Sequence, residues 1–403
     1  MGRAETSSIE RPAQQRSAAR VVVTGMGAIS ALGVGVEALW QGLLDGRCGI
    51  GPLTRLDASR HRVGQAAEAR DFESGEGAGH AIALATAAGA EAIHSAQLGE
   101  DELGRTALVL ASNFGPMARM ERLLSGDADA ASARGFHDDA LREVAERLAI
   151  GGFRSALSLS CASGNAAIGY AADLIRHGRA NIALAGGYDA LSEVVWAGLC
   201  SLRAMTDGVL RPFDRRRDGT VFGEGAGVLV LERADHAEER GAQPLAEFLG
   251  CATSSNAFHM THPDPDGGGM VRAMRGALRE ANLAPESVDH VNAHATGTPP
   301  NDKLETMAIK TVFGERARRL PVNGIKSMIG HAMGAAGALE AIASIMTLRE
   351  SVIPPTIGLE ELDPECDLDC VPGAARRADV HTVLNNSAGF GGCNASVLFG
   401  RCE

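Results

Sequence analysis

The chain has 403 residues, and its 38 lysines and arginines stand against 50 aspartates and glutamates, which gives a formal net charge of −12. Hydrophobic residues at 45% and charged residues at 22% are typical of a globular protein with a sizeable core. The acidic balance argues against a general nucleic-acid-binding protein, and no apolar run reaches the roughly 18 residues of a membrane-spanning helix. We therefore expect neither nucleic acid nor membrane as a partner.

The N-terminal part of the chain alternates apolar runs with helical stretches. Residues 1–18 are polar and aperiodic, which predicts a disordered tail. The elements predicted after it are a buried strand at 20–24, a helix at 36–44, a turn-rich loop at 51–70, a small-residue helix at 79–97 and a strand at 106–111. This alternation is typical of an α/β protein.

The segment 114–150 departs from this pattern because it is helical and rich in charges of both signs. Charge runs are usually solvated faces, so we interpret the segment as a cap or a partner surface rather than as core.

A short strand, a turn and a helix of small residues occur in that order twice, at 156–175 and at 321–343. The repetition predicts a duplicated α/β fold, with an N-terminal half at 19–250 and a C-terminal half at 251–403. Proteins of this class bind ligands beyond the carboxyl ends of their strands, so the turns that follow the strands are the candidate sites.

Cys161 lies in such a turn, after a strand at 156–160 and before a helix at 164–175. The N-terminus of a helix lowers the pKa of a nearby thiol and favours the thiolate, which predicts a nucleophile. A buried structural cysteine fits the position equally well. The chain has no Gly-x-Ser-x-Gly motif here, so a serine nucleophile is disfavoured.

Two histidines occupy corresponding places. His294 follows a predicted strand at 288–293, and His331 follows the predicted strand at 321–325 and its turn. A lone histidine in a loop is usually a surface residue or a helix cap, but two in equivalent turns, with a cysteine in a third, indicate a shared site. Close helix packing would explain Gly330 and Gly334 without explaining the histidine beside them.

A glycine-rich turn at 385–392 connects predicted strands at 380–384 and 395–399 and contains Phe390. Glycines allow positive φ angles and can direct backbone N–H groups inward, which suggests an oxyanion hole beneath a mobile aromatic lid. A tight hairpin with an exposed phenylalanine is the alternative.

Four motifs in this order resemble those of the elongating β-ketoacyl-acyl carrier protein synthases, the decarboxylating ketosynthases of the thiolase superfamily. They are SCASG around Cys161, HATGT from His294, KSMIGHAMGAAGALE from Lys326 and GFGG around Phe390. The resemblance extends from about Val21 to Leu398. It implies a thiolase-like duplicated five-layer α-β-α-β-α fold and an acyltransferase that needs no metal or cofactor, because its substrates arrive on the phosphopantetheine of an acyl carrier protein.

The resemblance also implies roles for the site residues. Cys161 would carry the acyl group, and His294 and His331 would each donate from Nε2 to the thioester oxygen of the malonyl substrate. The backbone N–H groups of Cys161 and Phe390 would form the oxyanion hole. Lys326 would hold a positive charge near His331, with Glu340 as its counter-charge, although a purely structural ion pair is the alternative.

The same resemblance suggests how substrates are held. Thr296 and Thr298 would bind the phosphopantetheine arm, or would only cap the following helix. Ala388 replaces a phenylalanine that is usual in relatives, which would admit a wider or stiffer acyl chain beside the nucleophile. Phe114 begins the segment that replaces the usual apolar tunnel loop. These departures make polyketide or polyene synthesis a contender beside fatty-acid synthesis.

Partner binding is expected at two surfaces. The acidic carrier would dock on a local basic patch, for which the candidates are Arg203, Arg55, Arg60 and Arg62. A homologous subunit would complete a homodimer or a heterodimer.

Two alternatives to a ketosynthase remain. One is a chain-length-determining partner subunit, although such subunits generally lack the nucleophile. The other is a coenzyme A-dependent thiolase, in which a second cysteine, here Cys393, would be reactive.

The eight cysteines are scattered through the chain. Cys366 and Cys370 lack the companion ligands of a zinc site, so we expect no metal there. With no recognisable secretory signal, the free thiols predict a cytoplasmic protein.

Overall fold

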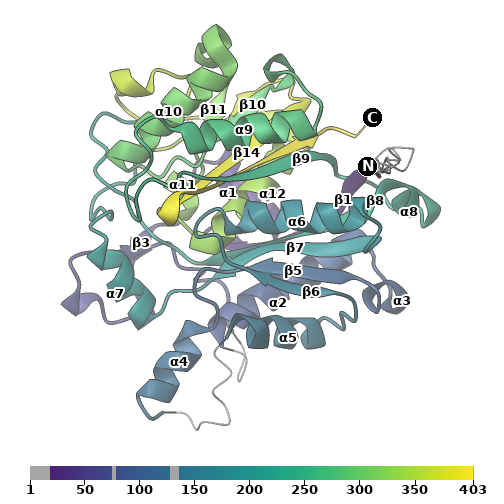
Figure 1. The fold of residues 1–403 in the computed structure, drawn as a ribbon. Helices are drawn as coiled ribbons and strands as arrows, with labels where there is room; N and C mark the ends of the chain where they lie inside the picture. The colour runs from purple at the N-terminus through teal and green to yellow at the C-terminus, as the bar shows by residue number, and fades with distance from the viewer. Residues whose placement is uncertain (1–18, 75–78, 128–135, 403) are drawn as a thin grey trace, which may run out of the picture.

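The computed structural model describes residues 19–74, 79–127 and 136–402 (Figure 1). The predicted tail at 1–18 lies outside the described residues. The strands pair along one path in the order β11-β10-β14-β15-β9-β1-β8-β7-β5-β6. Their bounds are β1 Val21–Ser30, β5 Ala107–Ala111, β6 Arg154–Leu157, β7 Ile182–Asp189, β8 Gly225–Arg233, β9 Ala246–Ser255, β10 His290–Asn292, β11 Val322–Asn323, β14 Thr382–Gly389 and β15 Cys393–Gly400.

The sheet path divides into two five-stranded parts that meet where β1 pairs with β9. Helices α6 (Ser163–Arg176) and α12 (Ala336–Glu350) lie between the parts and contact strands of both. The first part is covered outside by α2 (His80–Ala96) and α5 (His137–Arg147), and the second by α9 (Gly268–Glu280) and α10 (Pro299–Phe313) (Figure 1). This arrangement is the predicted duplicated five-layer α-β-α-β-α fold. Strand β9 runs across residue 250, where the sequence suggested a boundary between the halves.

The central layer is thin because its helices are built of small residues. A Cβ on Gly164 of α6 would lie 2.6 Å from the backbone nitrogen of Ala338 in α12, and a Cβ on Gly169 would lie 2.4 Å from the sulfur of Cys251. Both distances are below any real contact, so glycine is required where α6 crosses its neighbours. This close packing buries both helices between the sheet parts and fixes the turns at their N-termini.

Two expectations for the strands need correction. The strand predicted at 156–160 ends at Leu157, because Ser160 takes a left-handed φ of 51° and turns the chain toward α6. The strand predicted at 321–325 is reduced to β11, and the chain then forms the short helix α11 (Lys326–Ile329) and a 3₁₀ turn at Met333–Ala335.

The charged segment forms α4 (Met117–Leu124) and α5, which flank residues outside the described ranges. Helix α4 projects from the lower edge of the molecule in Figure 1, as a solvated segment would. Helix α5 does not, because Ala140, Leu141 and Val144 are buried in the core cluster under α2. The expectation of a segment outside the core is therefore wrong for α5. Its charges occupy the opposite, solvated face.

Within the described ranges, no helix combines the length and the apolarity needed to cross a membrane.

Candidate active site

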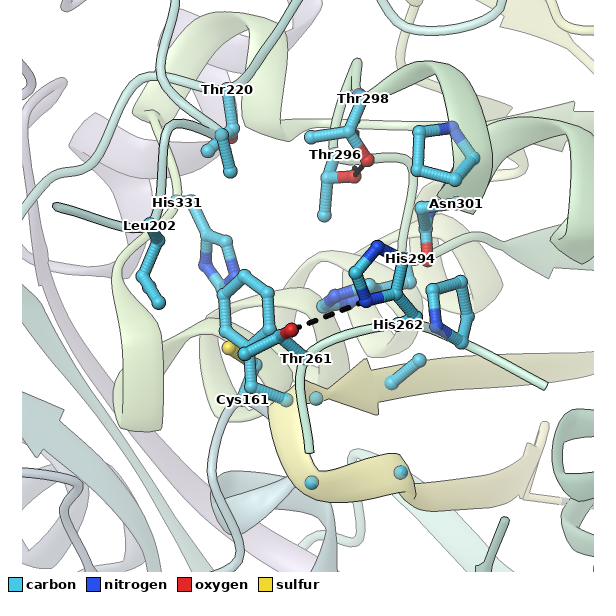
Figure 2. Close-up of a pocket in the computed structure, with 18 of the residues that line it drawn as sticks. Cys161, Leu202, Thr220, Thr261, His262, His294, Thr296, Thr298, Asn301 and His331 are labelled. Carbon is cyan, nitrogen blue, oxygen red and sulfur yellow. Dashed lines mark hydrogen bonds between the residues drawn. The ribbon is translucent and has the colours of Figure 1, made fainter. Parts of the chain in front are cut away.

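One cavity brings together the cysteine and the two histidines for which the sequence predicts a shared site. Cys161, His294 and His331 all line it, although they come from three separate turns (Figure 2). Cys161 precedes α6, His294 follows β10, and His331 follows α11. Each turn follows a strand or a short helix next to the central layer, as the α/β rule for ligand sites predicts.

The turn around Cys161 is held tightly. The backbone N–H of Leu159 donates to the Ser163 hydroxyl at 2.6 Å, which closes the turn over the left-handed Ser160. Gly389, next to Phe390 of the predicted lid, lies so near that a Cβ on it would be 2.8 Å from the Cys161 nitrogen. The glycine-rich loop and Cys161 therefore share one wall of the cavity.

The thiol itself differs from expectation. Burial raises the pKa of Cys161 to about 11, and the positive charge of Lys326 opposes this only in part. The prediction of a thiolate stabilised by the helix N-terminus is thus wrong: Cys161 is 4% exposed and lacks the solvation that a thiolate needs. At neutral pH Cys161 is therefore a neutral thiol.

Lys326 contacts His294 directly, and its charge also acts on His331, as the sequence suggested. Its ammonium donates to the His294 backbone oxygen at 2.6 Å and faces His294 Nδ1 at 3.2 Å. It also pairs with Glu340, and both side chains are fully buried. Because Nδ1 faces a cationic donor, the proton of a neutral His294 ring lies on Nε2.

The backbone of His294 is fixed by a residue that the sequence analysis missed. Glu305 in α10 accepts hydrogen bonds from the N–H groups of His294 and Ala295, each at 2.8 Å, and from the Asn386 amide at 2.7 Å. Ala295 has a left-handed φ of 42°, so the carboxylate holds a strained turn. The sequence does carry a signal for this support, because an acidic residue, Glu305, stands a short distance after the HATGT motif.

His331 has its own support. Its ring stacks on Phe222 with centroids 5.3 Å apart, and its Nδ1 accepts a hydrogen bond from the Met333 N–H at 3.2 Å. Its backbone bridges to Val221 and Gly223. The acceptor role of Nδ1 again leaves the proton on Nε2.

Both histidines are neutral over the ordinary pH range. Their rings meet edge to face with centroids 5.3 Å apart. Burial, together with the charge of Lys326, holds the pKa of His294 and of His331 well below 6.5. The cavity thus presents two neutral Nε2–H donors beside a cysteine.

The mouth of the cavity is lined by polar side chains. Thr296 and Thr298 bond to each other at 2.9 Å, and the Thr298 side chain does not cap α10 (Figure 2). Thr261 and His262, on a loop that the sequence analysis did not assign to the site, close another side of the mouth. The mouth therefore offers hydroxyl and imidazole groups to a polar substrate arm.

The remaining predicted residues divide between the cavity and its surroundings. Ala388 and Phe390 line it. Among the described residues that line it, Phe114 is not found: it packs against a neighbouring apolar cluster that includes Phe222 and Met333. Phe114 therefore belongs to this cluster rather than to the open cavity.

The four arginines predicted to bind the carrier also differ in how close they lie to the cavity. Arg203 lies at the rim, and Arg62 donates to the backbone oxygen of Met205 at 2.6 Å, which places it beside that rim. Arg60 is exposed on the neighbouring loop. Arg55 instead pairs with buried Glu224 at 2.7 Å, so its guanidinium is engaged within the fold.

The other cysteines lie outside the cavity. Burial raises the pKa of Cys366 to about 12 and holds that of Cys370 well above its ordinary value. Cys393 is absent from the described lining residues, although its neighbours Gly392 and Asn394 are present. Across the described parts of the chain, no group of three or more histidine, cysteine or acidic side chains is arranged to hold a metal ion.

Comparison with known proteins agrees with this geometry. The family models "Beta-ketoacyl synthase, N-terminal domain" and "Beta-ketoacyl synthase, C-terminal domain" match residues 18–237 and 245–360. The chain is 39% identical to a 3-oxoacyl-[acyl-carrier-protein] synthase 2 of Synechocystis, over 95% of this chain and 98% of the relative.

Two solved structures superpose over 96% of this chain and all of theirs. The ishigamide ketosynthase/chain length factor gives a TM-score of 0.91 at 39% identity. A ketosynthase of a type II polyketide synthase, bound to the hexaketide and in complex with its acyl-carrier protein, gives 0.90 at 32%. The chain therefore belongs to the β-ketoacyl synthase family and is an acyltransferase.

Proposed function

We propose that this β-ketoacyl-acyl carrier protein synthase performs its decarboxylative condensation with Cys161 as the acyl-bearing nucleophile and with His294 and His331 as the pair that stabilises the enolate. The observation that supports this is the single cavity in which the sulfur and two neutral Nε2–H imidazoles meet. Such an arrangement suits a reaction that forms a covalent acyl intermediate and then an oxyanion.

In the first step the Cys161 sulfur attacks the thioester carbonyl of the acyl substrate. The new carbon–sulfur bond forms as the bond to the carrier's thiol breaks, and the proton of the cysteine ends on the departing carrier thiol. The backbone N–H groups of Cys161 and Phe390 stabilise the tetrahedral oxyanion.

In the second step a malonyl thioester loses CO₂, and the electron pair of the broken carbon–carbon bond forms an enolate. His294 and His331 donate from Nε2 to its oxygen. The enolate carbon attacks the acyl carbonyl, the bond to Cys161 breaks, and the thiolate takes a proton from solvent. Loss of CO₂ drives bond formation, so the proposal requires no cofactor beyond the carrier's phosphopantetheine.

Lys326 keeps His294 in the required tautomer, because its ammonium occupies the space where a second ring proton would point. Its pairing with Glu340 keeps the buried ammonium compensated. The Thr296–Thr298 pair would bind the amides of the phosphopantetheine arm at the mouth.

The acyl carrier protein is the partner that delivers both substrates, and the rim with Arg203 and Arg62 would receive it. The two solved neighbours are a ketosynthase/chain length factor and a ketosynthase complexed with its carrier, which supports pairing with a homologous subunit as well. All eight cysteines are free, which supports a cytoplasmic location.

Two alternatives fit less well. A partner subunit that only sets chain length has no use for the intact Cys161 and histidine pair. A thiolase would need Cys393 at the cavity, where the described lining does not include it. Ala388 leaves space beside the nucleophile, which favours an acyl chain wider than a saturated one.

The test is mass spectrometry of the purified enzyme after incubation with an acyl-carrier thioester. We expect one acyl adduct, on Cys161, that disappears with a β-ketoacyl product when malonyl-carrier thioester is added. Cys161→Ala should give no adduct, and Cys393→Ala should behave as the parent enzyme. An adduct on Cys393, or condensation with acetyl instead of malonyl thioester, would contradict the proposal.

A further inference from the structure

A buried aspartate outside the cavity joins two of the turns that border it. Asp189 ends β7, is fully buried and belongs to none of the motifs discussed above. Its Oδ2 accepts a hydrogen bond from the Gly334 N–H at 2.7 Å, in the turn that follows His331. Its Oδ1 accepts from the Ser112 hydroxyl at 2.6 Å and from the Phe114 N–H at 3.1 Å.

The carboxylate has no free acceptor capacity on either oxygen. The Asn113 N–H reaches both oxygens, at 3.0 and 3.2 Å. A Cβ on Gly334 would lie 2.6 Å from Oδ2, so only glycine lets the backbone approach this closely. Burial raises the pKa of Asp189, and the hydrogen bonds that surround it favour the charged form against that burial.

The bond to Gly334 acts on the turn after His331 through Met333, the residue directly before Gly334. Met333 has a left-handed φ of 53°, a conformation that is unfavourable for a non-glycine residue and persists only where neighbours enforce it. In this conformation the Met333 N–H points at His331 Nδ1. Asp189 holds the next N–H and so holds the turn.

We propose that Asp189 is a positioning residue for the decarboxylation step: it fixes the turn after His331, so that Met333 donates to Nδ1 and the ring keeps its Nε2 proton directed at the thioester oxygen. The inference rests on the proposed role of His331 in that step. Through Asn113 and Phe114 the same carboxylate fixes the start of the 114–150 segment.

The proposal separates the two half-reactions. Acyl transfer to Cys161 uses the oxyanion hole and the thiol, and Asp189 contacts neither. Its negative charge only raises the pKa of that thiol, so removing the charge does not hinder acylation. Decarboxylation uses the Nε2–H of His331, whose direction depends on the turn. Loss of Asp189 should therefore slow CO₂ release while leaving acyl transfer nearly intact, whereas general loosening of the fold would slow both.

The experiment measures both half-reactions in Asp189→Ala and in the isosteric Asp189→Asn. One assay follows acylation of Cys161 by mass spectrometry, and the other follows CO₂ release from malonyl-carrier thioester. We expect CO₂ release to fall by roughly tenfold or more, as for loss of one preorganised oxyanion donor, and acylation to change by less than about threefold.

Two further variants make the result specific. Met333→Gly removes the cost of the left-handed conformation, so in the Asp189→Ala background it should restore part of the CO₂ release rate. Asp214→Asn is the matched control, since Asp214 is also a buried carboxylate that binds several backbone N–H groups, but around Glu360 and Glu361. It should leave the ratio of the two rates unchanged.

Every outcome of this experiment either supports or overturns the proposal. Equal loss of both half-reactions, or loss of neither, in the Asp189 variant that folds would overturn the proposal. If the parent enzyme itself neither acylates Cys161 nor releases CO₂, the proposed function fails instead, and the two failures are therefore distinguishable.

Discussion

Three buried histidines have different roles in this molecule, although all three are neutral. His294 and His331 are held neutral beside Lys326 and belong to the cavity. His290, on β10, only bonds through Nε2 to the Asn323 side chain at 2.9 Å, and burial lowers its pKa to about 4. His290 lies on β10, before the turn that carries His294, and does not line the cavity. A change at His290 should therefore alter the stability of the fold and not the proposed chemistry.

Replacing His290 by Gln should change the pH dependence of stability. Between about pH 6.5 and pH 4 the unfolded chain binds a proton at this histidine that the folded chain does not, so the folded state loses stability as the pH falls through that window. The variant lacks this loss. On going from pH 7 to pH 5, its free energy of unfolding relative to the parent should improve by about 2 kcal/mol. Urea unfolding at both pH values measures this, and a constant difference would contradict it.

Ala388 controls the space beside the proposed nucleophile, since it lines the cavity on β14, the strand that leads to Phe390. Replacing it by Phe should fill that space and exclude branched or rigid acyl chains, while short saturated chains still reach Cys161. Competition between acyl-carrier thioesters of different length and rigidity measures the selectivity. Ala388→Ser, which adds little volume, is the control. Unchanged selectivity in the phenylalanine variant would show that the acyl chain lies elsewhere.

At the scale of helices and turns, residue type and spacing predicted the arrangement well. The strand–turn–helix units around Cys161 and Lys326 were predicted from apolar runs and small residues, and the structure places both helices in the central layer. Predicting that their turns meet required only the rule that ligands bind beyond the strand ends.

The spacing of residues along the chain could not predict contacts between segments that are far apart in the sequence. Asp189 binds Gly334, 145 positions away, and the raised pKa of Cys161 follows from burial by segments distant in sequence. Neither leaves a local pattern in the sequence. The end of the strand before Cys161 was predicted wrongly for a related reason: the left-handed Ser160 lies in a turn held by Ser163 and by the glycine loop packed on it.

The central helices give a prediction for a whole element. Gly164→Ala would push α6 away from α12, because the added carbon would lie 2.6 Å from the Ala338 nitrogen, and overpacking of this kind typically costs about 1–3 kcal/mol. Gly198 in α7 (Glu193–Ser201) is the matched control, since nothing lies within 4 Å of its added carbon. Gly198→Ala should raise stability by up to about 1 kcal/mol through helix propensity. Thermal unfolding of both variants checks this; equal effects would contradict the close approach.

At the scale of the whole molecule, docking of the proposed acidic carrier has to work against a net charge of −12. A global field of that sign repels the partner at long range, so attraction depends on local charge and weakens within roughly 8 Å at physiological ionic strength. Arg203 lines the cavity and Arg62 lies beside its rim, whereas Arg55 is bound to Glu224 within the fold. The proposed docking surface is thus narrower than the arginine-rich loop in the sequence suggested.

Reversing the charge of Arg203 should weaken docking without altering the chemistry. Arg203→Glu is expected to raise the KM for carrier-bound substrates about tenfold or more, since it removes an attraction and adds a repulsion at the rim, and to leave kcat nearly unchanged. A small pantetheine thioester that lacks the carrier should react equally well with variant and parent. Arg319→Glu, an equal change of net charge at an exposed position away from the cavity, is the control and should leave KM within about twofold. If both variants raised KM alike, net charge rather than the rim would govern docking, and the carrier surface would have to be sought elsewhere.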